Sequence, residues 1–426
     1  GTCLHWGCIP SKSLIASAGA LRTIRRAGEF GIRLEGRALP DLAAMVERKD
    51  KVVAALARGI ESLFKSHGVD HIRGQGALLD RGRIRVEAPE GLALEVEGEK
   101  VLIATGSRPA PLPAFPIDGE RILSSDQAVH LRELPPSLLI IGAGAIGCEF
   151  AFLYRELGAD VTVVELLERA LPQGDEDVSR TIGRELRKAG VKLLTGCKIL
   201  RVAPEAEEMV AHLEGGEKLS AHKVLVSVGR ALNSDGVGLE GVGVELARGG
   251  AIRVDERMET SVPGIYAAGD VVGGMLLAHK ASAEGVVAVE NALGRDARMD
   301  YSAIPAGVFT HPEVGVVGMS EREAREAGHD VRVGRFLLRA LGKAMAEGET
   351  AGEVKVVADG KSGRLLGVHI VGDHAADLVH EAALAIRSGL TVADLARTVH
   401  AHPTLAEAIQ EAAHDVGSEA IHLPRR

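Results

Sequence analysis

The chain has 426 residues, which is enough for about two to four domains. It carries 50 Lys and Arg residues against 59 Asp and Glu residues, and this net charge of −9 argues against nucleic acid as a partner, because phosphate binding needs a basic surface. Hydrophobic residues make up 46% of the chain, yet no apolar run approaches the roughly 20 residues that span a bilayer, so we expect no membrane partner.

The first part of the chain is predicted to consist of helices followed by short strands. Pro10 suits the first turn of a helix, and the apolar pattern predicts a second helix over residues 41–67. Residues 74–99 have a strand-like pattern that ends in the apolar run 101–104. Four prolines between residues 109 and 116 then indicate a connector and a domain boundary.

A regular alternation of strands and helices follows this connector, and such βαβ order predicts a parallel sheet. The predicted elements are strand 138–141, a helix to about residue 157, strand 161–165, helix 177–189 and strand 191–194. Further boundaries are expected near residues 233–242 and 304–305. The last part is predicted to combine strands 353–358 and 365–371 with helices 375–388 and 392–396.

Two of the four cysteines, Cys3 and Cys8, lie close together, whereas Cys148 and Cys197 stand alone and are expected in the core. Four cysteines in a chain of this length exclude a secreted fold that depends on many disulfides for its stability. Half a zinc site is one interpretation of the pair, but no second pair of ligands has zinc spacing, so we expect no metal. The second interpretation of the pair is a redox disulfide, because a helix that starts near Cys8 would stabilise the Cys8 thiolate. The spacing alone does not decide between them.

A glycine-rich turn follows the predicted strand 138–141 and opens a helix. Gly142 suits the tight turn, Gly144 allows a pyrophosphate to approach the backbone, and Gly147 allows the helix to pack on the strand. Glu165 ends the next strand, where a carboxylate accepts hydrogen bonds from the ribose hydroxyls of NAD and repels the extra phosphate of NADP. The sequence therefore predicts an NAD site.

Near the C-terminus, His402 precedes a proline and a predicted helix that would start at about Thr404. Such a helix would place Glu407 one turn in, where its carboxylate would hold the imidazole. This pairing fixes the tautomer and raises basicity, which suits a general base acting on a thiol. His400 is an alternative base, but it lacks the proline, helix and acid context.

Together these motifs resemble those of the pyridine nucleotide–disulfide oxidoreductases, from Gly1 to the helix of Glu407. Further stretches carry the same resemblance: residues 104–109, Gly229-Arg230 with Asn233, residues 260–270, residues 277–281 and residues 312–314. The resemblance implies an α/β fold with two Rossmann-like domains, for FAD and NAD, and an α+β dimerisation domain. The implied segments are 1–112 (FAD domain, first part), 113–240 (NAD domain), 241–303 (FAD domain, second part) and 304–426 (dimerisation domain).

Within the family, the likeness is greatest to members that oxidise protein-bound dihydrolipoamide and reduce NAD⁺. It implies that Cys8 is the thiol nearer the flavin, that Cys3 exchanges with lipoamide, and that His402 from the second subunit of a homodimer, oriented by Glu407, is the base. The implied partners are lipoyl domains, and the expected location is the cytoplasm, because dithiol cycling needs a reducing compartment. In this resemblance, Lys12 and Glu149 form an ion pair beside the flavin, and Asp270 binds the ribityl chain of the flavin. The full set of implied cofactor residues is Lys12, Thr105, Gly106, Glu149, Gly229, Arg230, Gly269, Asp270, Leu277, Ala278 and His279.

Two alternatives stay open. One is another NAD(P)H-dependent disulfide reductase, similar to glutathione reductase, although Glu165 is followed by Leu166, Leu167 and Glu168 rather than by basic residues that would favour NADP. The other is an inactive truncated subunit without FAD. The resemblance implies that the family's first βαβ unit, which holds the FAD pyrophosphate, would precede Gly1. We therefore expect the chain as it stands to bind FAD poorly and to fold badly.

Overall fold

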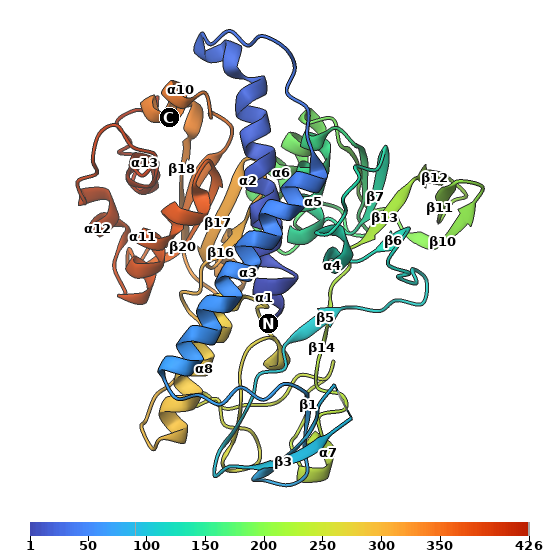
Figure 1. Cartoon of the computed structure of the whole chain (residues 1–426). Helices are drawn as coiled ribbons and strands as arrows, with labels where there is room; N and C mark the ends of the chain where they lie inside the picture. The colour runs from blue at the N-terminus through green and yellow to red at the C-terminus, as the bar shows by residue number, and fades with distance from the viewer. Residues whose placement is uncertain (90, 425–426) are drawn as a thin grey trace. The chain divides into compact units, whose positions relative to one another are not determined.

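The computed structural model describes residues 1–89 and 91–424, and the chain divides into two compact units (Figure 1). The first unit contains residues 1–14, 43–112 and 229–300. The second contains residues 15–42, 113–228 and those from 301 on.

The first unit combines helices with three small sheets. Its helices are α1 (Thr2–His5), the start of α2 (Cys8–Arg25), α3 (Leu42–Ser66), α7 (Leu239–Val242), the 3₁₀ turn η2 (Asp270–Val272) and α8 (Ala278–Ala292). Strands β1 (Gln75–Leu78), β2 (Arg83–Glu87) and β3 (Ala93–Glu97) form an antiparallel meander. Strand β4 (Val101–Ile103) pairs in parallel with β15 (Ile265–Ala267), and β5 (Ser107–Pro109) pairs antiparallel with β14 (Arg230–Leu232). A core that includes Leu78 of β1, Ile103 of β4, Ile265 of β15 and Val271 joins the meander and the β4–β15 sheet to η2.

In the second unit, residues 122–226 build a five-stranded parallel sheet of order β6-β13-β7-β8-β9. The strands are β6 (Ile122–Leu123), β13 (Lys223–Val226), β7 (Ser137–Ile141), β8 (Asp160–Val164) and β9 (Lys192–Leu194). Strand β7 has the sequence Ser-Leu-Leu-Ile-Ile because a central parallel strand is buried on both faces. The helices of this part are α4 (Ser125–Ala128), α5 (Ala145–Leu157) and α6 (Glu176–Lys188), and a separate antiparallel sheet contains β10 (Ile199–Glu205), β11 (Glu208–Leu213) and β12 (Lys218–Ala221).

The rest of the second unit is an antiparallel sheet of order β16-β17-β20-β19-β18, with helices packed against it. Its strands are β16 (Ala306–Val308), β17 (Glu313–Gly318), β18 (Val331–Leu337), β19 (Glu353–Asp359) and β20 (Leu365–Gly372). The helices are η1 (Ala27–Phe30), α9 (Glu321–Glu326), η3 (Leu338–Ala340), α10 (Gly342–Glu347), α11 (Ala375–Arg387), α12 (Val392–Arg397) and α13 (Glu407–Val416). Buried residues of the sheet, such as Val356 and Ile370, share a core with Val379 of α11 and Ile409 of α13.

The structure confirms the predicted α/β class, the helix over residues 41–67 and the βαβ order after residue 137. It differs in two local features. The short helix α1 has no counterpart among the predictions, and α13 begins at Glu407 instead of at about Thr404. The hydroxyl of Thr404 donates to the carbonyl oxygen of Ala401 (2.7 Å), so this side chain does not cap a helix. In the described residues, no helix has the length and apolar character needed to cross a membrane.

Candidate active site

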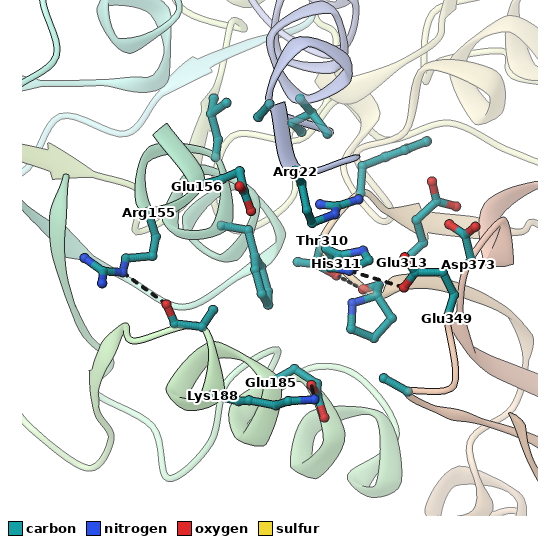
Figure 2. Close-up of a pocket in the computed structure, with 18 of the residues that line it drawn as sticks. Arg22, Arg155, Glu156, Glu185, Lys188, Thr310, His311, Glu313, Glu349 and Asp373 are labelled. Carbon is teal, nitrogen blue, oxygen red and sulfur yellow. Dashed lines mark hydrogen bonds and ion pairs between the residues drawn. The ribbon is translucent and has the colours of Figure 1, made fainter. Parts of the chain in front are cut away.

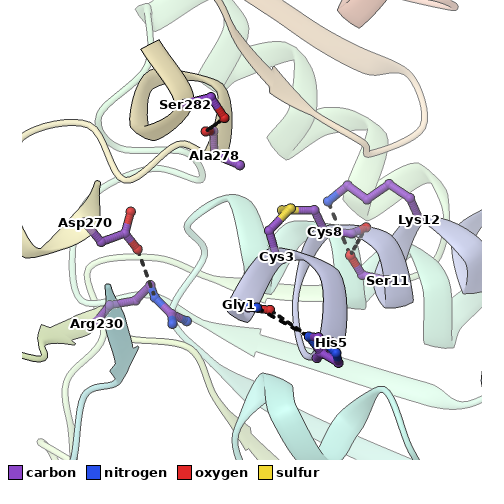
Figure 3. The surroundings of a disulfide bond; sticks show 10 residues. All are labelled: Gly1, Cys3, His5, Cys8, Ser11, Lys12, Arg230, Asp270, Ala278 and Ser282. Atoms are coloured by element: carbon purple, nitrogen blue, oxygen red, sulfur yellow. Dashed lines mark hydrogen bonds and ion pairs between the residues drawn. A yellow bond between two sulfur atoms is a disulfide. The ribbon is translucent and has the colours of Figure 1, made fainter. Parts of the chain in front are cut away.

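Cys3 and Cys8 form a disulfide, with their Cα atoms 4.6 Å apart (Figure 3). Cys3 lies in α1, and Cys8 is the first residue of α2, as predicted from Pro10. The free N–H groups and the dipole at this helix start stabilise a thiolate at Cys8 once the disulfide opens. The geometry is that of a small redox loop on a helix N-terminus.

The other two cysteines take no part in this loop. Both are free thiols, and burial raises the pKa of Cys148 to about 12, so it stays protonated at neutral pH. No cluster of three or more His, Cys, Asp or Glu residues suited to a metal ion occurs in the part of the chain that the structure describes.

Four side-chain hydrogen bonds hold the first turns of α2. The Nη1 atom of Arg48 on α3 donates to the carbonyl oxygen of Ser13 (3.1 Å) and to its hydroxyl (2.9 Å). On α2 itself, the Ser11 hydroxyl donates to the carbonyl oxygen of Cys8 (3.3 Å), and Nζ of Lys12 donates to that hydroxyl (3.3 Å). No sequence pattern distinguishes Arg48, because its partner Ser13 lies 35 residues away.

Asp270 begins the turn η2 and points toward Arg230 (Figure 3). The Ser107 hydroxyl donates to Oδ2 of Asp270 (2.5 Å), and Nε of Arg230 donates to the Ser107 hydroxyl (2.6 Å). Ser107 stands inside one of the motifs noted in the sequence, yet it was not among the predicted site residues. It connects two residues that were.

A buried ion pair on α8 holds the turn η2. Oε2 of Glu284 accepts from the Gly269 N–H (2.8 Å), and Nζ of Lys280 donates to the carbonyl oxygens of Gly269 (3.3 Å) and Gly273 (2.9 Å). Gly269 has φ +85°, and a Cβ there would lie 3.3 Å from the Cβ of Ala281. The turn therefore requires glycine and is anchored at both of its ends.

Further predicted cofactor residues lie in the first unit. Thr105 and Asn233 exchange hydrogen bonds (2.7 and 2.9 Å), and the Asn233 N–H donates to the carbonyl oxygen of Gly106 (2.9 Å). Gly229 precedes β14, and the Ala110 N–H donates to its carbonyl oxygen (3.1 Å). Leu277 is the N-cap residue of α8, which begins with Ala278 and His279.

The turn between β7 and α5 has the shape that a dinucleotide needs. Gly142 has φ +99°, and a Cβ there would lie 2.6 Å from the carbonyl oxygen of Ser227. A Cβ on Gly147 would overlap the carbonyl oxygen of Gly142, so the helix packs on the strand only with glycine here. Gly144 is the N-cap residue, with open space where its Cβ would be. This open backbone fits a pyrophosphate at the start of α5.

Glu165 follows β8, and its carboxylate lies beside the glycine turn. Its Oε2 accepts from the Ala143 N–H of the turn (2.6 Å), and its Oε1 accepts from the Leu167 N–H (2.8 Å). The side chain is buried, so its carboxylate is fixed beside the turn, where a ribose would lie.

The imidazole of His402, in the loop before α13, is hydrogen-bonded to the carboxylate of Glu407, the first residue of that helix. Nδ1 of His402 lies 2.9 Å from Oε1 of Glu407, and the Thr404 N–H donates to Oε2 (2.8 Å). Burial alone would raise the pKa of Glu407, but these two hydrogen bonds keep its pKa below the ordinary value. The ionised carboxylate accepts from Nδ1–H, which leaves Nε2 of the exposed His402 ring to take a proton.

The second unit also contains a cavity of about 610 Å³, which Figure 2 shows with Arg22 and His311 among its lining residues. The predicted residue Glu149 lines the same cavity. Oε1 of buried Glu149 accepts from the Phe309 N–H (2.9 Å). His311 points into the same cavity, and burial, followed by the positive charge of Arg22, lowers the pKa of His311 to about 4. Sequence reasoning did not single out His311.

Comparison with known proteins agrees with this arrangement. Residues 1–285 match the pyridine nucleotide-disulphide oxidoreductase family, and residues 304–413 match the dimerisation domain of the same family. The chain belongs to the pyridine nucleotide-disulphide oxidoreductase family. It is therefore an FAD-dependent, NAD-linked enzyme of the disulfide oxidoreductase class, and its dimerisation domain supports a homodimer.

Two similar proteins are named dihydrolipoyl dehydrogenase, and two solved structures are also similar to this chain. A dihydrolipoyl dehydrogenase of Bacillus subtilis is 41% identical over 99% of this chain and 92% of its own length. A mitochondrial dihydrolipoyl dehydrogenase of Pisum sativum is 40% identical over 99% of this chain and 85% of its own length. Among solved structures, LpdA from Mycobacterium tuberculosis superposes with a TM-score of 0.91 at 32% identity, covering 97% of this chain and 91% of that one. The flavoprotein disulfide reductase RclA from Escherichia coli has a TM-score of 0.86 at 28% identity, covering 97% and 91%.

The residues present fit a part of each cofactor. The glycine turn and Glu165 would hold the pyrophosphate and a ribose of NAD, while Asp270 and the residues hydrogen-bonded around it would hold the ribityl chain of FAD. When bound, the flavin supplies two-electron transfer between the protein dithiol and the nicotinamide.

Proposed function

We propose that this enzyme oxidises the dihydrolipoamide of lipoyl domains to lipoamide and reduces NAD⁺. The observation that carries the proposal is the pairing of two features in one chain: a disulfide that starts a helix and a carboxylate-held imidazole in the dimerisation domain. The names of the 40–41% identical relatives in Bacillus and Pisum support the same activity.

The reaction begins with a proton transfer. Nε2 of His402, from the second subunit of the homodimer, removes a proton from one thiol of dihydrolipoamide, and Glu407 stabilises the imidazolium through Nδ1–H. The new thiolate attacks the sulfur of Cys3. The Cys3–Cys8 bond breaks, and Cys8 leaves as a thiolate at the start of α2, where the helix stabilises it.

A second exchange completes the oxidation. The remaining thiol of the substrate, after losing its proton, attacks its own sulfur in the mixed disulfide and displaces Cys3. Lipoamide leaves with one new S–S bond, and the protein holds two electrons as the reduced Cys3–Cys8 pair. The two substrate thiols give up two protons in all. The two electrons and the equivalent of one of these protons pass on to NAD⁺ as hydride, so one proton is released for each NADH formed.

The proposal extends to the cofactor residues and the location. Lys12 and Glu149 are proposed to serve the flavin; Nζ of Lys12 donates to the Ser11 hydroxyl, and Oε1 of Glu149 accepts from the Phe309 N–H. We place the enzyme in the cytoplasm because a dithiol cycle needs a reducing compartment.

Steady-state assays of the holoenzyme test the function. We expect turnover of dihydrolipoamide with NAD⁺ and little turnover of glutathione disulfide with either NADH or NADPH. Preference for glutathione disulfide and NADPH would make the chain a glutathione-reductase-like enzyme instead. Absence of turnover with every dithiol, in a preparation that still transfers electrons from NADH to a dye, would refute the assignment of the disulfide.

A further inference from the structure

His400 lies two residues before the base, in the loop between α12 and α13, and it differs sharply from His402 in its surroundings. Its side chain is 6% exposed, whereas that of His402 is 77% exposed. Nε2 of His400 lies 3.0 and 3.2 Å from the two carboxylate oxygens of Glu381 on α11. Nδ1 lies 2.9 Å from the carbonyl oxygen of Thr398. Both ring nitrogens are therefore engaged.

Hydrogen-bond accounting assigns the protons on this ring. A carbonyl oxygen only accepts, so an N–H at Nδ1 faces Thr398, while Nε2 faces the carboxylate of Glu381. Both ring nitrogens are thus directed at protein partners. These contacts favour a structural role for His400 over the role of a base.

The same contacts fix the loop that carries His402. The segment between α12 and α13 forms no helix or strand, so side chains determine its path. Nε2 of Gln410 on α13 donates to the carbonyl oxygen of Thr398 (2.9 Å), and the Thr404 hydroxyl donates to that of Ala401 (2.7 Å). The His400–Glu381 pair ties this loop to α11.

We propose that the His400–Glu381 pair positions the base. One residue, Ala401, separates His400 from His402, so displacement of the buried ring moves the backbone of His402 and with it the Nε2 atom that takes the proton. A charge-assisted hydrogen bond is the stronger kind, which suits a positioning role in a loop without regular structure. The inference rests on the proposed function, because it takes His402 as the base.

Substitutions at Glu381 test this role in the holoenzyme. In Glu381→Ala, we expect kcat for dihydrolipoamide oxidation to fall about tenfold to a hundredfold, because misplacement of a reacting group by about 1 Å has effects of that size. KM should change little, since the proton transfer contributes in the transition state. The rate from NADH to a dye should be unchanged, because it does not use the base.

A conservative variant distinguishes an effect on the position of His402 from a general disturbance of the fold. In Glu381→Gln, a neutral His400 keeps Nδ1–H on Thr398 and accepts at Nε2 from the glutamine amide, so most of the lost kcat should return. His400→Gln, whose amide reaches toward Glu381, is the second variant should Glu381→Ala not fold. Asp377→Ala is the matched control, because Asp377 lies one turn earlier on α11, is 87% exposed and pairs with the exposed His374; its kinetics should equal those of the unmodified enzyme.

The outcomes distinguish the two levels of the argument. Unchanged kcat in Glu381→Ala, a parallel loss of NADH-to-dye activity, or a Gln variant as slow as the Ala variant would overturn the positioning role. If His402→Gln itself oxidises dihydrolipoamide at the normal rate, the proposed base is wrong, whatever the Glu381 variants show.

Discussion

Lys280 and Glu284 form an ion pair inside the first unit, with Nζ 3.1 Å from Oε1 and side chains only 2% and 0% exposed. Lys280 also donates to the carbonyl oxygens on both sides of the turn η2, and Glu284 accepts from the Gly269 N–H at its start. Two charged side chains on one helix thus determine the conformation of the turn that carries Asp270.

Removing one partner of this pair should destabilise the protein strongly. Lys280→Met leaves the buried Glu284 carboxylate without its cation, and we expect a loss of about 3–5 kcal/mol in the free energy of unfolding. Urea denaturation measures it. Lys188→Met is the matched control, because Lys188 is 75% exposed beside Glu185 and should cost no more than about 1 kcal/mol. Equal losses in the two variants would contradict the structural role of the buried pair.

Substitution of His402 should slow the oxidation of the dithiol without slowing electron transfer from NADH. His402→Gln should slow dihydrolipoamide oxidation by about 10²–10⁴-fold, the usual contribution of a general base. NADH-to-dye transfer should persist, because no thiol is deprotonated in that assay. Equal losses in both assays would mean that His402 acts on structure or on the cofactor instead of on the dithiol.

Substitution of Glu165 should weaken the binding of NAD. In Glu165→Ala, a charge-assisted contact to ribose is lost together with the support of Ala143, and we expect KM for NAD⁺ to rise about tenfold to a hundredfold. Initial rates at varied NAD⁺ concentration measure this change. Glu168→Ala is the control, because Glu168 is exposed on the following loop and should leave KM unaltered. An unaltered KM in both variants would remove Glu165 from the NAD site.

His311 should make stability depend on pH. Burial, followed by the charge of Arg22, lowers its pKa from 6.5 to about 4 in the folded protein, so between these pH values the unfolded chain binds the extra proton. His311 therefore contributes stability that is fully present above pH 6.5 and is lost as the pH falls toward 4, with a slope of up to about 1.4 kcal/mol per pH unit.

Urea unfolding of His311→Asn between pH 4 and 6.5 tests this dependence. The variant should have the shallower slope, whereas His374→Asn, which removes a 62% exposed histidine, should keep the original one. The same slope in all three proteins would show that other groups account for the pH dependence.

The features that sequence reasoning found were those encoded by local patterns. Gly142, Gly147 and Glu165 lie within one βαβ unit, and their roles follow from a turn, a helix and the next strand. Each requirement is specific: Gly142 has a positive φ, and Gly147 has no room for a side chain. Because only glycine meets these backbone constraints, a glycine at each of these positions indicates the constraint from the sequence alone.

The features that it missed depend on tertiary contacts. His400 was set aside for lack of an acidic partner, yet its partner Glu381 lies on another helix, 19 residues earlier. Lys280 and Glu284 have the i,i+4 spacing of an ordinary exposed pair, and only their burial reveals their role. The start of α13 was misplaced because the Thr404 hydroxyl, a typical helix cap, bonds to Ala401 instead.

The bond between Glu165 and the Ala143 N–H has a consequence for how the dinucleotide enters. The carboxylate braces the glycine turn by itself, so the site is preorganised and NAD⁺ does not have to order a loose loop on arrival. Less of the binding free energy is then lost to conformational entropy. The Glu165 side chain thus braces the glycine turn, and the same carboxylate would accept hydrogen bonds from the ribose of NAD.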